Sequence, residues 1–203
     1  MRIAAITTGG KDSLFAAYKA SEGNELVCLI GEKSDNGPNI GLLELQAKAM
    51  NLPLITMETL GESIGIAKEK YKVEGVVSGV ISDVSKKNSI ENSAKISKVT
   101  CVFPLLEINK EIYLNELMAR FNVILIGIDA EGLNEDILGT RVGLTFIDRM
   151  QSLNVDIVGE GGEFQTYVLE CPLFKKIIKI EEHEIRMESE NKGQYKIKKA
   201  ILV

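Results

Sequence analysis

Short apolar runs and stretches with helical periodicity alternate along the first half of the chain. The apolar runs predict buried strands, and apolar positions that recur every three or four residues predict helices. The predicted strands cover residues 3–6, 25–30, 52–57, 75–80 and 99–103. One predicted helix carries Leu14, Phe15 and Tyr18 on one face, and three more cover residues 39–51, 60–71 and 85–98. This alternation indicates an α/β fold with a parallel, doubly wound sheet.

The pattern changes after Pro104. A helix is predicted over residues 112–121, followed by the most apolar strand of the chain, residues 123–128. A second helix, residues 142–153, is expected to turn inward its apolar side chains Val142, Leu144, Phe146, Ile147 and Met150. Short alternating stretches then predict a mixed or antiparallel sheet. We therefore expect two domains, residues 1–104 and a smaller C-terminal α+β domain of residues 105–203.

Composition narrows the class of protein. The chain has 203 residues, of which 45% are hydrophobic and 26% charged, as in ordinary globular proteins. It contains no apolar run of the roughly 18 residues that a membrane helix needs, and no signal-peptide pattern, so we expect a cytoplasmic protein without a membrane partner. The net charge of -5 argues against general affinity for nucleic acid. Cys28 and Cys101 lie in strand-like runs, which is typical of buried free thiols.

A glycine turn between the first strand and the first helix is the clearest candidate binding site. In Thr8-Gly9-Gly10-Lys11-Asp12-Ser13, adjacent glycines let backbone N–H groups converge, and the helix start adds partial positive charge. Such a turn suits a phosphate. A Walker A loop is excluded because Ala5 stands where its first glycine is needed and Asp12 separates Lys11 from Ser13; a Gly-x-Gly-x-x-Gly fingerprint is also absent.

A second glycine-rich block lies in the latter half of the chain, at Gly159-Glu160-Gly161-Gly162-Glu163-Phe164-Gln165-Thr166. Three glycines allow sharp bends, and Glu160 and Glu163 are left on a loop, where packing does not require them. The block is therefore a second candidate site, with a solvated acidic turn as the alternative.

The two blocks together resemble a known family. Residues 8–13 resemble the Ser-Gly-Gly-x-Asp-Ser signature of the PP-loop ATP pyrophosphatases, with Thr8 for the first Ser. Over nearly its full length the chain resembles the diphthine ammonia ligases, or diphthamide synthases. Besides the two glycine blocks, this resemblance rests on Pro38-Asn39-Ile40, Leu45-Gln46-Ala47-Lys48-Ala49, Leu52-Pro53-Leu54, Gly79-Val80-Ile81-Ser82-Asp83, Glu91, Pro104-Leu105 and Pro172-Leu173-Phe174.

The resemblance implies a HUP-like fold and an ATP-dependent amide ligase. Such an enzyme adenylates the carboxylate of diphthine, a modified histidine on translation elongation factor 2, and ammonia then displaces AMP. The implied cofactors are ATP and Mg²⁺, and the implied partners are elongation factor 2 and ammonium. A homo-oligomer is left open.

The resemblance also assigns residues to roles. The implied ATP-binding residues are Thr8, Gly9, Gly10, Lys11, Asp12 and Ser13. Backbone N–H groups of the turn would hold the β- and γ-phosphates, with the Lys11 ammonium and the Ser13 hydroxyl as further donors. Asp12 would bind Mg²⁺ or brace the loop; a helix N-cap is the alternative.

Two further pairs of acids are candidates for work on the acceptor. Glu160 and Glu163 would orient it or take a proton from ammonium, for which a raised pKa is suited. Asp83 and Glu91 flank the acceptor or merely cap a helix and face solvent. Phe164 would offer its ring to the trimethylammonium group of diphthine, although a core position is the simpler interpretation.

Two other functions stay open. One is another PP-loop adenylating enzyme that acts on a small carboxylic acid; tRNA thiolation is disfavoured because paired cysteines are absent. The other is an ATP-binding module without catalysis, which would leave the block at residues 159–166 unexplained.

Overall fold

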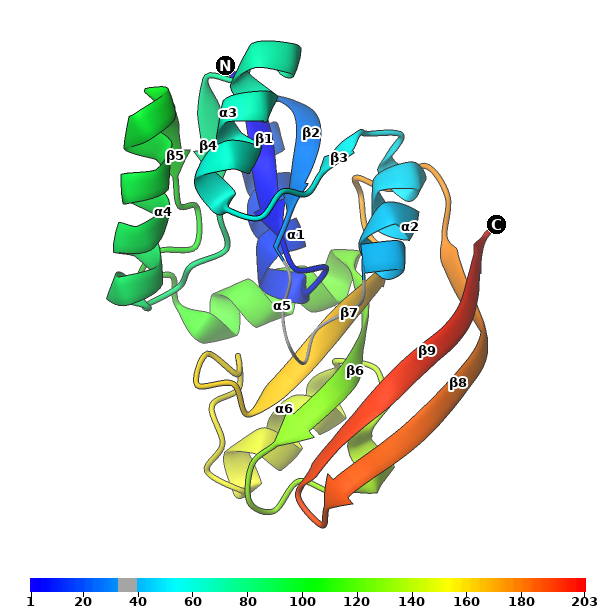
Figure 1. Ribbon diagram of the computed structural model, residues 1–203. Helices are drawn as coiled ribbons and strands as arrows, with labels where there is room; N and C mark the ends of the chain where they lie inside the picture. Colours follow the sequence, from blue (N-terminus) through cyan, green and yellow to red (C-terminus); the bar gives the residue numbers. More distant parts are fainter. Residues whose placement is uncertain (33–39) are drawn as a thin grey trace.

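The first half of the chain forms a five-stranded sheet whose paired strands all run parallel (Figure 1). The structure, a computed structural model, describes residues 1–32 and 40–203. The strand order is β3-β2-β1-β4-β5. The strands are β1 Arg2–Thr7, β2 Glu25–Gly31, β3 Leu54–Ile55, β4 Gly75–Val77 and β5 Thr100–Val102. The helices between them are α1 Lys11–Ser21, α2 Ile40–Met50, α3 Leu60–Tyr71 and α4 Val84–Ser97.

Helices cover both faces of this sheet, which confirms the doubly wound prediction. Successive side chains of a strand point to opposite faces. In β1, Ile3 and Ala5 join the buried cluster that contains the apolar side chains of α1, whereas Ala4 and Ile6 join the cluster that contains those of α3 and α4. Both faces of β1 are therefore buried, and the strand lies at the centre of the fold.

The second half forms a four-stranded antiparallel sheet in the order β7-β6-β9-β8. Its strands are β6 Asn122–Asp129, β7 Phe164–Glu170, β8 Ile178–Ser189 and β9 Lys192–Leu202, and its helices are α5 Lys110–Arg120, the short 3-10 helix η1 Glu135–Ile137 and α6 Leu144–Ser152. Figure 1 shows α5 and the beginning of α1 between the two sheets. One buried cluster includes side chains of both sheets, and the domain boundary at residues 104–105 stays a prediction.

Three expectations need correction. The alternation at residues 174–180 predicts a strand, but β8 begins only at Ile178 and continues through the charged stretch of residues 181–184 to Ser189, because β9 pairs with it along its length. Leu144 is 68% exposed rather than inward. Residue 142 does not belong to the helix, because the N–H of Val142 donates to the carbonyl of Val123. The turn that the residue types of Glu32-Lys33-Ser34-Asp35-Asn36-Gly37-Pro38 predict lies, apart from Glu32, outside the described residues.

The cysteines are free. Cys28 and Cys171 are buried, and burial raises the pKa of each thiol to about 12, so neither is reactive at neutral pH. Cys101 was expected to be buried and is only partly so, because β5 is the edge strand of its sheet.

Gly79, just after β4, lets the chain pass against the start of α1. A Cβ added there would lie 2.4 Å from the backbone carbon of Asp12 and 2.7 Å from the nitrogen of Ser13. Backbone atoms cannot move aside as a side chain can, so we expect Gly79→Ala to lower the free energy of unfolding by about 1–3 kcal/mol in urea denaturation.

Gly23→Ala is the matched control for this substitution, because an added Cβ would meet no atom within 4 Å. It should stay within about 0.5 kcal/mol of the original protein. Equal stability of the two variants would contradict the close approach at Gly79.

Candidate active site

A pocket lies where the chain leaves β1 toward one face of the sheet and leaves β4 toward the other. Open α/β sheets bind ligands at such a switch point, beyond the carboxyl ends of the strands. The pocket has a volume of about 180 Å³. Its lining residues are Ile6, Thr8, Gly10, Asp12, Ser13, Glu32, Ser78, Gly79, Val80, Asp83, Lys86, Gly159 and Glu160. The two glycine blocks of the sequence therefore meet at one pocket.

The glycine turn takes the shape that its sequence predicts. Gly9 has φ of +85°, which strains residues with a Cβ, and Gly10 is the N-cap of α1. The first N–H groups of a helix have no partner within the helix and carry partial positive charge. Asp12 and Ser13, in this first turn, line the pocket. This end of α1 is thus suited to bind an anion.

Strand β7 of the second sheet fixes the turn. The N–H of Lys11 donates to Thr166 Oγ1 at 3.1 Å, and the N–H of Val168 donates to the carbonyl of Gly9 at 3.3 Å. Gln46, fully buried on α2, donates through Nε2 to the carbonyls of Gly9 and Val168 at 3.0 and 2.9 Å. The turn is therefore held from both halves of the chain.

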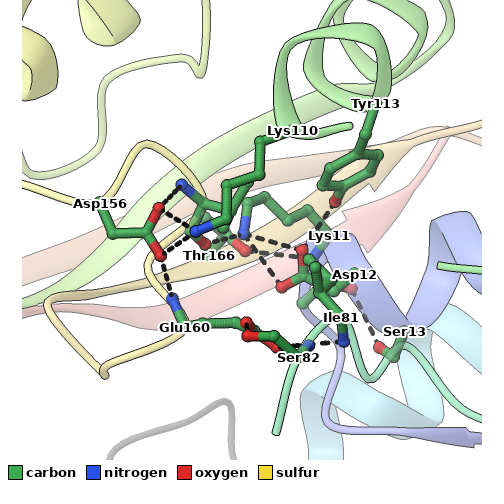
Figure 2. Close-up of polar contacts among 12 residues, drawn as sticks. Lys11, Asp12, Ser13, Ile81, Ser82, Lys110, Tyr113, Asp156, Glu160 and Thr166 are labelled. Atoms are coloured by element: carbon green, nitrogen blue, oxygen red, sulfur yellow. Dashed lines mark hydrogen bonds and ion pairs between the residues drawn. The ribbon is translucent and has the colours of Figure 1, made fainter. Parts of the chain in front are cut away.

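The Lys11 ammonium is directed away from the pocket, contrary to the expectation that it contacts phosphates. The side chain is 2% exposed and does not line the pocket. Its Nζ donates to the carbonyl of Val158 at 2.6 Å and to both carboxylate oxygens of Asp12 at 3.0 Å. Figure 2 shows Lys11 directed toward Asp12. A buried ammonium needs such acceptors, and here they hold it in the interior.

Asp12 is braced within the first turn of α1 and is not the N-cap, so that alternative is excluded. Besides the bonds from Lys11, its Oδ1 accepts a hydrogen bond from the Tyr113 hydroxyl at 2.7 Å. Burial, followed by the Asp12 charge, raises the pKa of Tyr113 well above its usual value, so the hydroxyl stays a donor. The Asp12 side chain is 33% exposed and still reaches the pocket.

Glu160 holds the loop after β4 to the loop before β7. Its Oε1 accepts from the N–H groups of Ile81 at 3.0 Å and Ser82 at 2.7 Å, and its Oε2 accepts from the Ser82 hydroxyl (Figure 2). Burial raises the pKa of Glu160, but these hydrogen bonds outweigh burial and leave the pKa below its ordinary value. This is the opposite of the raised pKa expected for a proton acceptor.

Asp156, which the sequence analysis did not single out, supports the same loop. Its carboxylate accepts from Lys110 Nζ at 2.8 Å and from the N–H groups of Val158 at 3.3 Å and Glu160 at 3.4 Å. Burial raises the pKa of Asp156, yet the Lys110 and backbone hydrogen bonds outweigh it and lower the pKa overall. The loop that carries Glu160 is therefore held by two sets of hydrogen bonds, those from Ile81 and Ser82 to Glu160 and those from the loop backbone to Asp156.

Glu163 does not line the pocket. Alternation along β7 places Thr166 and Phe164 on the face toward the glycine turn and Gln165 on the opposite face, and Glu163 lies in the bend just before the strand. Within the described part of the chain, Glu163 Oε2 is buried and has no hydrogen-bond partner. Phe164 is 4% exposed and packs on Phe146, so its ring is not available to a trimethylammonium group.

Comparison with known proteins places the chain in a family. Family models match residues 1–101, described as the diphthamide synthase N-terminal domain, and residues 109–203, described as the diphthamide synthase C-terminal domain. Relatives from Mus musculus and Rattus norvegicus, each named diphthine–ammonia ligase, are 30% identical. The matches cover 93% and 91% of this chain and 86% and 84% of the relatives. The chain belongs to the diphthine–ammonia ligase family.

A solved structure described as a predicted subunit of tRNA methyltransferase from Methanocaldococcus jannaschii matches 84% of this chain and 97% of its own. The TM-score is 0.46 and the identity 16%, which is too weak a likeness to extend the comparison. In the part of this chain that the structure describes, no helix has the length and apolar character needed to span a bilayer.

The sequence left two interpretations open for Asp83 and Glu91, a place beside the acceptor or a place that caps a helix and faces solvent. The structure puts the two residues in different surroundings. Asp83 is the N-cap of α4, where its Oδ1 accepts from the N–H of Lys86 at 2.9 Å, and it also lines the pocket. Glu91 pairs with Lys87 at 2.7 Å and does not line it. Among the residues described, no three His, Cys, Asp or Glu side chains gather into a metal site. A cation in this pocket would therefore also need oxygen atoms of a bound molecule, such as phosphate oxygens, as ligands.

Because the pKa of Glu160 is lower in the folded protein than its ordinary 4.5, ionised Glu160 stabilises the fold above that pH. This contribution is lost as the pH falls through the lower, folded-state pKa. We expect Glu160→Gln to lower the free energy of unfolding at neutral pH, with a difference from the original protein that shrinks below pH 4.5. Urea denaturation at a series of pH values measures it; a difference independent of pH would contradict the ionised contact.

Proposed function

We propose that this protein is an ATP-dependent ligase that converts the diphthine of translation elongation factor 2 into diphthamide, with AMP and pyrophosphate as by-products. The observation that carries the proposal is the fixed glycine turn of residues 8–13, which presents a helix N-terminus to the pocket at the switch point of the sheet. Its context is a family whose relatives are named diphthine–ammonia ligase.

The proposed chemistry has two steps. An oxygen of the diphthine carboxylate attacks the α-phosphorus of ATP, the bond to the β-phosphate breaks, and pyrophosphate leaves. Ammonia then attacks the carbonyl carbon of the acyl adenylate, the bond to AMP breaks, and the nitrogen releases a proton. A carboxylate alone is a poor acyl donor because oxide would have to leave, and the adenylate removes that obstacle.

In this mechanism the protein positions phosphates and balances charge. The N–H groups at residues 12 and 13, which have no partner within the helix, and the hydroxyl of Thr8 would bind phosphate oxygens at the pocket. The Ser13 hydroxyl donates to the carbonyl of Gly10 at 3.0 Å and would have to exchange that bond for a phosphate oxygen. The N–H of Lys11 already donates to Thr166, and its ammonium is buried. Lys11 therefore contributes through Asp12, whose orientation it fixes.

The residues at the pocket fit a divalent cation. Asp12, Glu32, Asp83 and Glu160 bring four carboxylates to a pocket that would hold a polyphosphate, an arrangement that repels the ligand unless a cation intervenes. Mg²⁺ commonly takes one or two carboxylates together with phosphate oxygens. We assign Asp12 as its protein ligand; when bound, the ion would neutralise charge on the departing pyrophosphate.

Glu160 acts, in this proposal, by holding Ile81 and Ser82 at the pocket edge. Its lowered pKa makes it a weak base at neutral pH, so ammonium loses its proton to another acceptor or reacts as free ammonia. Glu163 is assigned no contact with the nucleotide. The substrate, a translation factor, would place the reaction in the cytoplasm.

The direct test supplies the protein with ATP, Mg²⁺, ammonium and elongation factor 2 bearing diphthine, and measures the mass of the factor and the nucleotide products. Amidation with AMP and pyrophosphate is the expected result. AMP formation only with a small carboxylic acid would instead indicate another adenylating enzyme. Bound but uncleaved ATP would indicate a nucleotide-binding module.

Asp12→Ala should lower the rate of AMP formation at least about 100-fold, because it removes the carboxylate that faces the pocket. Asp12→Asn keeps the size of the side chain and should lose nearly as much. Glu91→Gln is the matched control, since Glu91 lies outside the pocket, and should keep its activity. Turnover by Asp12→Ala at the original rate would contradict the role of Asp12; thermal melting checks that each variant is folded.

A further inference from the structure

The pocket has a single cationic side chain among the described residues that line it, that of Lys86. Every other charged side chain in that lining is a carboxylate. The Lys11 ammonium, which the sequence suggested for phosphate binding, is buried and bonded to Asp12 and Val158. If the pocket holds a nucleotide, its phosphates therefore have one protein ammonium within the same cavity.

The backbone of Lys86 is fixed while its side chain is weakly held. Lys86 is the third residue of α4, and its N–H donates to Asp83 Oδ1 at 2.9 Å, which sets the position of its Cα. The side chain is 48% exposed, and its ion-pair partner in the described part of the chain is Glu32 Oε2 at the long distance of 3.8 Å. Such an exposed ion pair contributes little and is easily exchanged.

The neighbouring Lys87, on the same helix, is by contrast held by close contacts. Its Nζ lies 2.7 Å from Glu91 Oε1 and 5.6 Å from the centre of the Phe103 ring, and its side chain is 26% exposed. It does not line the pocket. Lys87 thus has the same charge at nearly the same place but is held on another face, which makes it a matched control.

We propose that Lys86 binds the phosphates of the nucleotide and exchanges its partner Glu32 for phosphate oxygens when the nucleotide enters. The inference rests on the proposed function, since it takes the nucleotide to be the ligand of this pocket. Phosphate is the stronger partner because it carries more charge and several acceptor oxygens. The N-termini of α1 and α4 both contribute residues to the pocket, and their partial positive charges act in the same direction.

The test compares the binding of ATP with that of adenosine, which lacks phosphates, by calorimetry at low salt. Lys86→Met should weaken ATP binding about 10-fold and leave adenosine binding unchanged, since it removes one charge-assisted contact. Lys86→Arg should keep most of the ATP affinity. Lys87→Met should leave both affinities unchanged.

Three results would overturn the assignment. They are an unchanged ATP affinity in Lys86→Met, an equal loss in Lys87→Met, which would indicate only the overall charge of the helix, and an equal loss for adenosine, which would indicate a damaged pocket. A protein that binds no ATP before substitution would refute the proposed function itself, so the two failures are distinguishable.

Discussion

The contact between β7 and the glycine turn is the interaction on which the rest of the structure depends. Thr166 accepts from the N–H of Lys11, Val168 donates to the carbonyl of Gly9, and Gln46 joins both segments. A glycine-rich turn alone has many conformations, and fixing it costs conformational entropy. Here the hydrogen bonds to the second sheet offset that entropy cost during folding, so the turn already has its anion-binding conformation before the ligand binds.

The charged side chains of the site form two groups that differ in burial. In the first group the buried side chains of Lys11 and Tyr113 donate hydrogen bonds to Asp12, which fixes the orientation of its carboxylate and leaves it partly exposed to the pocket. In the second group the exposed side chains of Lys86 and Glu32 form a long ion pair. The first group keeps its geometry because a buried charge must keep its partners, whereas the exposed ion pair can exchange a partner for a ligand.

Features determined by local sequence were predicted well. Helix α3 begins and ends where its pattern indicated, since Thr59 and Glu62 form a reciprocal capping box at its start. The glycine turn between β1 and α1 also followed from the local sequence, whereas its meeting with the second glycine block at one pocket is a finding of the structure. Features determined by distant contacts were not predictable. In the sequence Tyr113 looks like an ordinary core residue, and its hydrogen bond to Asp12 exists only because α5 packs beside α1 in the fold.

The fate of Lys11 illustrates the same limit. Its position in the motif suggested a phosphate contact, and nothing in the local sequence signals that the carbonyl of Val158, 147 residues away, accepts a hydrogen bond from its ammonium. Likewise, the low pKa of Glu160 depends on Ser82, which the family motif contains without indicating a contact. The residue types of the site could be read from the chain, but the partners of its charged groups required the fold.

A crystal structure with Mg²⁺ and a non-hydrolysable ATP analogue tests the central claim most directly, because that claim concerns where the phosphates bind and what the turn does when they bind. The account predicts a triphosphate within hydrogen-bond distance of the first turn of α1, with the bonds from Thr166, Val168 and Gln46 to the glycine turn unchanged. A nucleotide bound outside the pocket, or a turn that separates from β7 to accept it, would contradict the account.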